Sequence, residues 1–252
     1  GGTEVTEQII YIHYDTVGNN VISKGIVNQN KNSLLKRLPH NLLLIHPAAK
    51  AGVYDRFTGF RVVKGQEAVK EFLDNGMKNP DSLGAWIDFA NMEMLHQLTP
   101  VEISELLYIA HAHNYLHSPF YYKLQNNYIY LSLPNHFTKM YFRYLEEFLD
   151  QFADSITKRM QKKVNEKRRF FQKEKVIAPF IVERKKDLVT LFREGVCLSF
   201  RQLEITDGIY QIPIFVCEDN LSLVDQPFDQ EDRIGILSYD SNSEEWNLQS
   251  EI

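Results

Sequence analysis

The feature that most constrains the fold of this 252-residue chain is the tetrapeptide Thr99-Pro100-Val101-Glu102, which has the pattern of a helix capping box. The Thr99 hydroxyl can accept a hydrogen bond from the Glu102 N–H, and the Glu102 carboxylate can accept one from the Thr99 N–H. Pro100 suits the first helical position, where no N–H is needed. Apolar residues then recur at helical spacing as far as Ala110. The sequence therefore predicts a helix over residues 99–114.

Strands are predicted on both sides of this helix. Residues 86–94 precede it, and their second half alternates apolar and polar side chains as a half-buried strand does. Residues 120–124 and 128–133 follow it and flank Gln125-Asn126-Asn127, where asparagine tolerates the positive φ of a hairpin turn. Together these segments predict a β-α-β-β unit.

A second, much longer helix is predicted from the cap Pro134-Asn135 onward. Apolar side chains recur at four-residue or similar steps and would form one ridge, consisting of Phe137, Tyr141, Leu145, Phe148, Phe152, Ile156, Met160 and Val164. A helix that continued to Lys173 would be roughly 55 Å long at about 1.5 Å per residue. A compact chain of this size has a radius of gyration near ~18 Å. We therefore expect this central helix to overhang the body, to bend, or to pair with another helix.

The rest of the chain alternates between short strands and helices. We expect a hairpin over residues 9–14 and 21–27, a short helix over 32–38, strands over 41–45 and 60–64, a helix over 66–75 that ends at Gly76, a further helix over 182–194, and two hairpins over 196–217 and 233–248. The predicted fold class is α+β, with mixed or antiparallel sheets, the β-α-β-β unit, one long central helix and a small C-terminal antiparallel sheet. Residues 1–175 are expected to form the main domain and residues 176–252 a C-terminal region.

Composition narrows the class of protein. Hydrophobic residues make up 44% of the chain and aromatic residues 12%, which is ample for a packed core. The apolar runs, such as residues 177–182, are too short to span a bilayer, and we expect no membrane partner. Cys197 and Cys217 are too few for a disulfide framework, so we expect free thiols and a cytoplasmic location.

The charges are strongly segregated along the sequence. Nine cations lie between Lys158 and Lys175 against two glutamates, whereas ten carboxylates follow from Glu218 onward against the single cation Arg233. This separation predicts either an internal electrostatic contact or an oppositely charged partner. The candidate partner-binding residues are Lys162, Lys163, Lys167, Arg168, Arg169, Phe170 and Phe171.

A histidine cluster offers an alternative, enzymatic site. His113 and His117 are four residues apart and could hold a metal on one helix face, but His111 points about 200° away from His113, and no Glu lies between them as in the H-E-x-x-H pattern. Imidazoles near a helix C-terminus also complement its dipole without a metal. A metal-dependent hydrolase would need a further carboxylate, from Asp88 or Glu93. The leading expectation is therefore no metal and no cofactor.

Three functions follow in order of preference. The first is a cytoplasmic, non-enzymatic binding or regulatory protein that contacts a protein partner, or its own acidic C-terminal region, through the basic helix and a tyrosine-rich sheet. The second is nucleic-acid binding through the same helix. The third is the hydrolase. The tyrosines concerned are Tyr115, Tyr121, Tyr122, Tyr128, Tyr130, Tyr141 and Tyr144.

Overall fold

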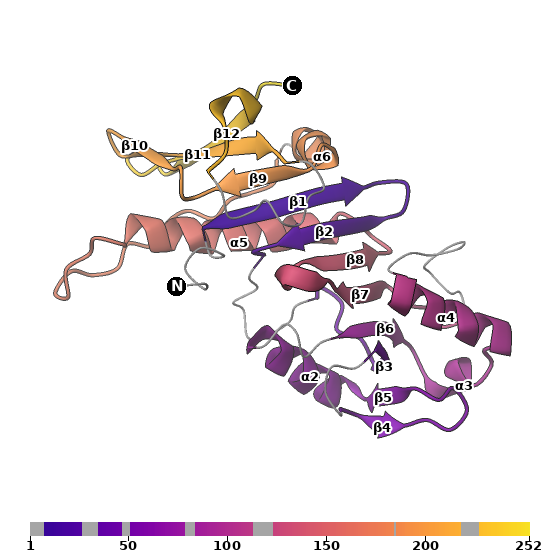
Figure 1. The fold of residues 1–252 in the computed structure, drawn as a ribbon. Helices are drawn as coiled ribbons and strands as arrows, with labels where there is room; N and C mark the ends of the chain where they lie inside the picture. Colours follow the sequence, from indigo (N-terminus) through magenta and orange to yellow (C-terminus); the bar gives the residue numbers. More distant parts are fainter. Residues whose placement is uncertain are drawn as a thin grey trace. The chain divides into compact units, whose positions relative to one another are not determined.

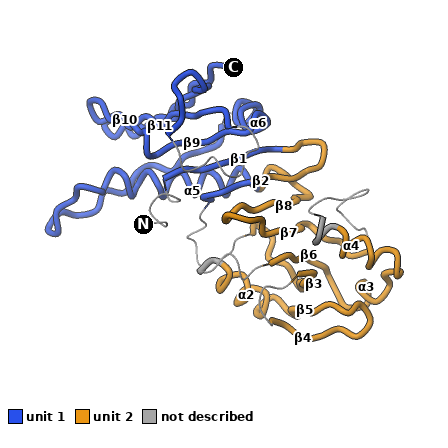
Figure 2. Tube along the Cα trace, viewed as in Figure 1, with its two compact units in different colours: residues 1–14, 23–27, 148–252 blue, residues 15–22, 28–147 orange. Residues whose placement is uncertain are grey.

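The structure is a computed structural model that describes residues 8–26, 35–46, 51–78, 84–112, 123–183, 185–217 and 227–252 (Figure 1). The chain forms two compact units (Figure 2). Unit 1 comprises residues 1–14, 23–27 and 148–252, and unit 2 comprises residues 15–22 and 28–147. The predicted N-terminal hairpin is confirmed as β1 (Ile9–Asp15) and β2 (Asn20–Lys24), and each of its strands is divided between the units. Residues 175 and 176, between which we expected the main domain to end, both belong to unit 1, and the predicted domain division stays a prediction.

Unit 1 is built on antiparallel strands in the order β13-β12-β11-β9-β1. Its elements after β1 are α5 (Glu147–Val164, of which Glu147 belongs to unit 2), α6 (Lys185–Arg193), β9 (Val196–Ser199), β10 (Glu204–Thr206), β11 (Ile209–Val216), η3 (Gln230–Asp232), β12 (Arg233–Asp240) and β13 (Glu245–Ser250). Both predicted C-terminal hairpins are confirmed. The β10–β11 turn has positive φ at Asp207 (52°) and Gly208 (80°), as tight two-residue hairpin turns require.

The apolar ridge of α5 forms the centre of the core of unit 1. Phe148, Phe152, Ile156 and Met160 are buried along one face, as their four-residue spacing predicts. The Phe152 ring packs edge-on against a ring of α6, with its centroid 5.0 Å from that of Phe192. One side of α5 is therefore fixed by aromatic packing.

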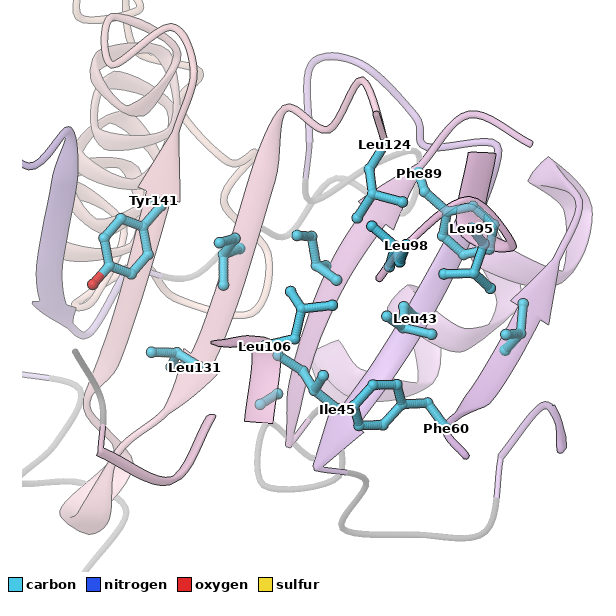
Figure 3. Close-up of a cluster of buried hydrophobic side chains, with 14 residues drawn as sticks. Leu43, Ile45, Phe60, Phe89, Leu95, Leu98, Leu106, Leu124, Leu131 and Tyr141 are labelled. Atoms are coloured by element: carbon cyan, nitrogen blue, oxygen red, sulfur yellow. The ribbon is translucent and has the colours of Figure 1, made fainter. Parts of the chain in front are cut away.

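Unit 2 carries the antiparallel strand order β8-β7-β6-β3-β5-β4. Its elements are β3 (Asn41–His46), β4 (Val53–Tyr54), β5 (Arg61–Lys64), α2 (Gln66–Lys78), β6 (Ala85–Phe89), α3 (Met92–Leu95), α4 (Pro100–Ala112), β7 (Tyr128–Ser132), η2 (Pro134–His136) and β8 (Thr138–Phe142). The predicted strands β3 and β5 and helix α2 are confirmed, although α2 runs past Gly76. A cluster of buried side chains fills the core of this unit, and Figure 3 shows Leu43, Leu106 and Leu124 from strand, helix and loop within it.

The capping box that opens α4 is confirmed in both directions. The Thr99 N–H donates to Glu102 Oε1 over 3.0 Å, and the Glu102 N–H donates to Thr99 Oγ1 over 3.2 Å. Leu106, on the apolar side of α4, is fully buried in the core cluster. The start of this helix is therefore set by four consecutive residues.

The predicted β-α-β-β unit is corrected in its strands. Strand β6 stops at Phe89, because the Asn91 side chain accepts a hydrogen bond from the Met94 N–H and caps the short helix α3. The alternation over residues 90–94 therefore belongs to a helix. After α4, residues 123–125 form a turn, and residues 120–122 of the predicted strand lie outside the described residues. Strand β7 pairs with β6 on one side and with β8 on the other.

The prediction of a long central helix is wrong at both ends. Residues 138–142 form β8, where Tyr141 pairs with Ile129, and α5 begins only at Glu147 and ends at Val164. Apolar residues four apart lie on one face of a strand as well as of a helix, so the spacing of Phe137 and Tyr141 does not distinguish the two. Asn135 has a φ of 63°, so it turns the chain between β7 and β8 and caps no helix.

Candidate macromolecule-binding loop

The loop that follows α5 carries most of the predicted binding residues. We call residues 165–175 the basic loop. Lys162 and Lys163 lie on the last turn of α5, where their charge complements the helix dipole. The other five predicted residues lie in the basic loop, so the predicted basic helix is corrected to a helix end and a loop. Figure 2 shows the chain of unit 1 continuing past α5 into this loop, away from the strands of the same unit.

The two ends of the basic loop are joined by one side chain. Asn165 Nδ2 donates to the Lys175 carbonyl oxygen over 2.8 Å, and the Lys175 N–H donates to Asn165 Oδ1 over 2.8 Å. The same Nδ2 donates to the carbonyl oxygen of Gln161 over 2.8 Å. The Asn165 side-chain amide thus hydrogen-bonds to the Lys175 backbone as a second backbone peptide would, and it closes the base of the loop. Asn165 is not among the residues predicted from the sequence, although asparagine is a common residue at helix C-termini.

The tip of the loop is a hydrogen-bonded turn. The Gln172 N–H donates to the Arg169 carbonyl oxygen over 2.9 Å, which is the bond of a four-residue β-turn. The Gln172 side chain strengthens this turn by accepting from the Arg169 N–H over 3.2 Å. Arg168 Nη1 donates to the Gln172 carbonyl oxygen over 2.8 Å. Phe170 and Phe171 therefore occupy the two central positions of a turn whose shape is fixed.

Two aromatic rings stand in solvent at this turn. Phe170 is 95% exposed and Phe171 94% exposed. The rings meet edge to face, with centroids 5.8 Å apart and an interplanar angle of 87°. Burying one such side chain is worth about 1.5–3 kcal/mol. The two rings therefore form an apolar surface that stays exposed to solvent in the folded protein.

Five cations lie close to the two phenylalanines in the sequence of the basic loop. Glu166 and Glu174 face the base of the loop, where Glu166 lies 3.3 Å from Lys163 Nζ and Glu174 accepts from Gln161 Nε2. Within the described part of the chain, no carboxylate forms an ion pair with the loop cations, which are Lys167, Arg168, Arg169, Lys173 and Lys175. The basic loop therefore presents uncompensated positive charge beside exposed rings.

The predicted internal clamp by the acidic C-terminal region is tested only in part. Residues 227–252 of that region are described, and Glu251 pairs with Arg233 rather than with the basic loop. Residues 218–226 lie outside the described residues. The clamp by the acidic C-terminal region therefore stays a prediction.

The predicted tyrosine-rich surface is mostly buried where the structure describes it. Tyr128, Tyr130 and Tyr141 are buried within unit 2. Tyr144 is 52% exposed, and the guanidinium of Arg37 lies 4.3 Å from the centroid of its ring. Tyr115, Tyr121 and Tyr122 lie outside the described residues. The tyrosine-rich sheet is thus mainly core, and the basic loop remains as the candidate binding surface.

Asp88, a candidate residue of the predicted hydrolase, has a structural role in unit 2. Its Oδ1 accepts from the N–H groups of Asn127 (2.9 Å) and Tyr128 (2.7 Å), and so holds the start of β7. Burial raises the pKa of Asp88 to about 7, although these hydrogen bonds oppose the shift. Glu93, the alternative, lies exposed on α3. Since His113 and His117 lie outside the described residues, the hydrolase site with either carboxylate stays a prediction.

Other polar groups of unit 2 form a hydrogen-bonded chain that was not predicted from the sequence, with Tyr128 and Glu147 buried and Arg37 exposed. The Tyr128 hydroxyl donates to Glu147, which is buried, and Glu147 also pairs with Arg37. The Arg37 N–H in turn donates to the Tyr128 hydroxyl over 3.2 Å. Each member of this triad is satisfied by the other two, which suits a structural role.

The metal hypothesis is not decided by the structure. His113 and His117 lie outside the described residues, and His111 is placed only by its backbone in α4. Among the residues that are described, no three histidine, cysteine or acidic side chains gather as metal ligands. Unit 1 has a pocket with a volume near 30 Å³ beside Gln202, Glu204 and Arg233, and a larger one near 370 Å³ beside Val182, Glu183 and Lys185.

The two cysteines are free thiols, as expected, and lie close together in unit 1. Both are buried, and the hydrogen bond to Cys217, together with burial, raises the pKa of Cys197. A nucleophilic cysteine needs the opposite shift. The geometry therefore favours a structural role for the pair.

Comparison with known proteins assigns no relative. The chain matches no protein-family model, no curated protein and no solved structure. No helix in the described ranges is both long and apolar enough to cross a membrane. The chemistry of the basic loop is therefore the main guide to function.

Proposed function

We propose that this chain is a non-enzymatic binding protein that captures a large anionic partner with the basic loop. The observation that carries the proposal is the exposure of Phe170 and Phe171 on a hydrogen-bonded turn flanked by unpaired cations. The cysteine usage supports a cytoplasmic location for this binding. A regulatory role would follow from the identity of the partner.

The internal hydrogen bonds of the loop support a binding role. Ordering a flexible segment costs free energy when a partner binds, and a loop ordered beforehand avoids part of that cost. Asn165 and Gln172 supply this order with side chains that contact only the loop and the adjacent α5. The loop thus holds its rings and cations in one arrangement before any partner arrives.

The direct test is capture by the immobilised protein from a cell lysate that retains its membranes. The loop variant carries Lys167→Glu, Arg168→Glu and Arg169→Glu, and a second variant carries Phe170→Ser and Phe171→Ser. Both variants should lose the captured partner, the first because the charge is reversed and the second because the apolar contact is removed. Circular dichroism should show wild-type folding, since all five side chains are exposed.

A matched control separates the loop from general charge effects. The control variant carries Arg56→Glu, Lys64→Glu and Lys70→Glu, which reverse three exposed cations of unit 2. It should capture the partner as the wild type does. Capture that is equal in the wild type and both loop variants would overturn the proposal, and so would capture that the control variant loses equally.

Nucleic-acid binding is the second candidate, and one observation favours it. Phe170 and Phe171 lie beside arginines, and exposed rings next to cations can stack on bases while the cations meet phosphates. This candidate predicts retarded mobility of single-stranded DNA or RNA at low salt, with affinity that falls linearly in a log–log plot against salt. Unchanged mobility at low salt would remove it.

A further inference from the structure

We infer that the partner of the basic loop is the surface of a bilayer that contains anionic glycerophospholipids. The inference rests on the proposed function and names the class of partner for the same loop. Its starting point is the order of groups along the loop: two rings at the turn, and cations on the two arms that lead to it. This order matches the depth profile of a lipid surface, from headgroup phosphates to the boundary of the acyl chains.

The outermost groups are apolar. Phe170 and Phe171 are the central residues of the Arg169–Gln172 turn, and their neighbours on both sides are hydrogen-bonded within the loop. Aromatic rings favour the membrane–water interface, where their apolar bodies leave water. A turn tip can therefore place both rings among lipid headgroups without any change in its backbone.

The cations lie where anionic headgroups would meet them. Arg168 and Arg169 precede the rings in the chain, and Lys173 and Lys175 follow them. Clusters of four to eight basic residues are typical of sites for anionic lipids, and each cation near the surface contributes about 1 kcal/mol. The five loop cations lie within that range.

The shape of the loop favours a lipid surface over a protein or a nucleic acid. Every residue from 166 to 176 is exposed, so the loop itself has no buried floor on which a peptide or a nucleic-acid strand could lie. The two rings stand at 87° to one another, so they do not offer parallel faces for successive bases. A fluid lipid surface needs neither a groove nor a stacking platform, because it adapts to a projecting tip.

This inference revises the expectation of no membrane partner. That expectation rested on the absence of an apolar run long enough to span a bilayer. Peripheral binding needs no such run, because a few apolar side chains and a cluster of cations are enough. The length of the apolar runs in the sequence therefore does not test peripheral membrane binding.

Sedimentation with lipid vesicles tests the inference. Vesicles of equal parts phosphatidylserine and phosphatidylcholine should carry the wild-type protein into the pellet, and vesicles of phosphatidylcholine alone should not. The variant with Lys167→Glu, Arg168→Glu and Arg169→Glu should partition at least about 100-fold less, because three attractive charges become repulsive. The control with Arg56→Glu, Lys64→Glu and Lys70→Glu should partition as the wild type does.

Fluorescence quenching tests whether the tip itself enters the lipid. A Phe170→Trp variant adds an exposed indole. Of the two native tryptophans, Trp86 is fully buried, and Trp246 is partly buried with its indole N–H donating to the Ala178 carbonyl oxygen. Phosphatidylserine vesicles with brominated acyl chains should quench the added indole and leave the wild-type emission nearly unchanged. A Phe57→Trp variant, on the half-exposed Phe57 of unit 2, should not be quenched.

The outcomes separate this inference from the proposed function. Loop-dependent sedimentation with quenching of the added indole supports it. Failure of the wild type to sediment with anionic vesicles overturns the inference alone if the lysate experiment still yields a partner that depends on the loop. Failure in both experiments overturns the proposed function as well. Sedimentation that the loop variant and the wild type share overturns the inference, since the contact would lie elsewhere.

Discussion

Asn165 and Lys175 are joined by two reciprocal hydrogen bonds of 2.8 Å, although nine residues separate them in the chain. The side-chain amide of Asn165 takes the place of a backbone peptide and closes the basic loop at its base. This contact explains how eleven residues with almost no buried side chain keep one conformation. It also makes Asn165 the position where the order of the loop can be removed without altering its rings or cations.

Replacing Asn165 should loosen the loop and leave the rest of the protein intact. The Asn165→Ala variant loses three hydrogen bonds at the base of the loop. If the closed loop is stabilised by about 1 kcal/mol less, the fraction of molecules in which the loop is open rises about fivefold. We expect trypsin to cut after Lys167, Arg168 or Arg169 about fivefold faster. Asn247→Ala, at an exposed residue of β13, serves as the control. Cleavage at the wild-type rate would contradict the role assigned to Asn165.

The capping box should contribute measurably to the stability of unit 2. Thr99→Ala removes the acceptor of the Glu102 N–H, and loss of a helix N-cap costs about 1 kcal/mol. Urea unfolding should show this loss as a lower midpoint with an unchanged slope. Ser104→Ala is the control, since the exposed Ser104 hydroxyl donates to the Pro100 carbonyl oxygen inside α4 and caps no helix end. An equal effect of both substitutions would show that the cap is dispensable.

Asp88 should make stability depend on pH. Folding raises the pKa of this carboxyl from 3.8 to about 7, because burial disfavours its charged form. The folded state therefore binds a proton that the unfolded state has lost, so the stabilisation is complete below pH 3.8 and is lost as pH rises to about 7. The slope should be at most about 1.4 kcal/mol per pH unit in that window.

The Asp88→Asn variant removes this titration. The asparagine Oδ1 can still accept from the N–H groups of Asn127 and Tyr128, which both donate to Asp88 Oδ1. The free energy of unfolding should then vary less with pH between 4 and 7 than in the wild type. Glu204→Gln, at an exposed carboxylate, should keep the wild-type slope. Parallel pH profiles for the wild type and Asp88→Asn would contradict the shifted pKa.

The two thiols should be inert in the folded protein. Cys197 is fully buried, Cys217 nearly so, and the raised pKa of Cys197 lowers its thiolate fraction. A thiol reagent should label neither cysteine in the native protein and both in denaturant, as mass spectrometry would show. A Ser243→Cys variant at an exposed turn supplies the reactive control. Rapid native labelling of Cys197 or Cys217 would show that unit 1 is less closed than the structure indicates.

Much of the fold followed from local signals in the sequence. The Thr99 cap, the hairpin over residues 196–217 and the ridge from Phe148 to Met160 are each set by residues close in the chain, and each is confirmed. The segment around Tyr141 was misassigned, because four-residue spacing is compatible with a strand face as well as a helix face. Only pairing with β7, which is a tertiary contact, decides between them.

The residues of the candidate site come from the sequence and stay a prediction, and the structure of the loop that carries five of them was not predicted. Charge counting along the sequence located Lys167 to Phe171, because segregation of charge is visible without a fold. It could not show that the helix ends at Val164, that Asn165 closes the loop, or that the rings occupy a turn. These features depend on hydrogen bonds between residues up to ten positions apart in the chain. The periodic pattern of apolar residues in the sequence does not predict such bonds.

Photocrosslinking from the loop tip tests the central claim most directly. Phe170 is replaced by benzoylphenylalanine, and the protein is irradiated in a lysate that retains its membranes. The account predicts an adduct with a lipid or another large partner that disappears when Lys167, Arg168 and Arg169 are changed to Glu, and that does not form from the same probe at Phe57. Equal adducts from both positions, or none from position 170, would contradict the claim that the basic loop is the binding surface.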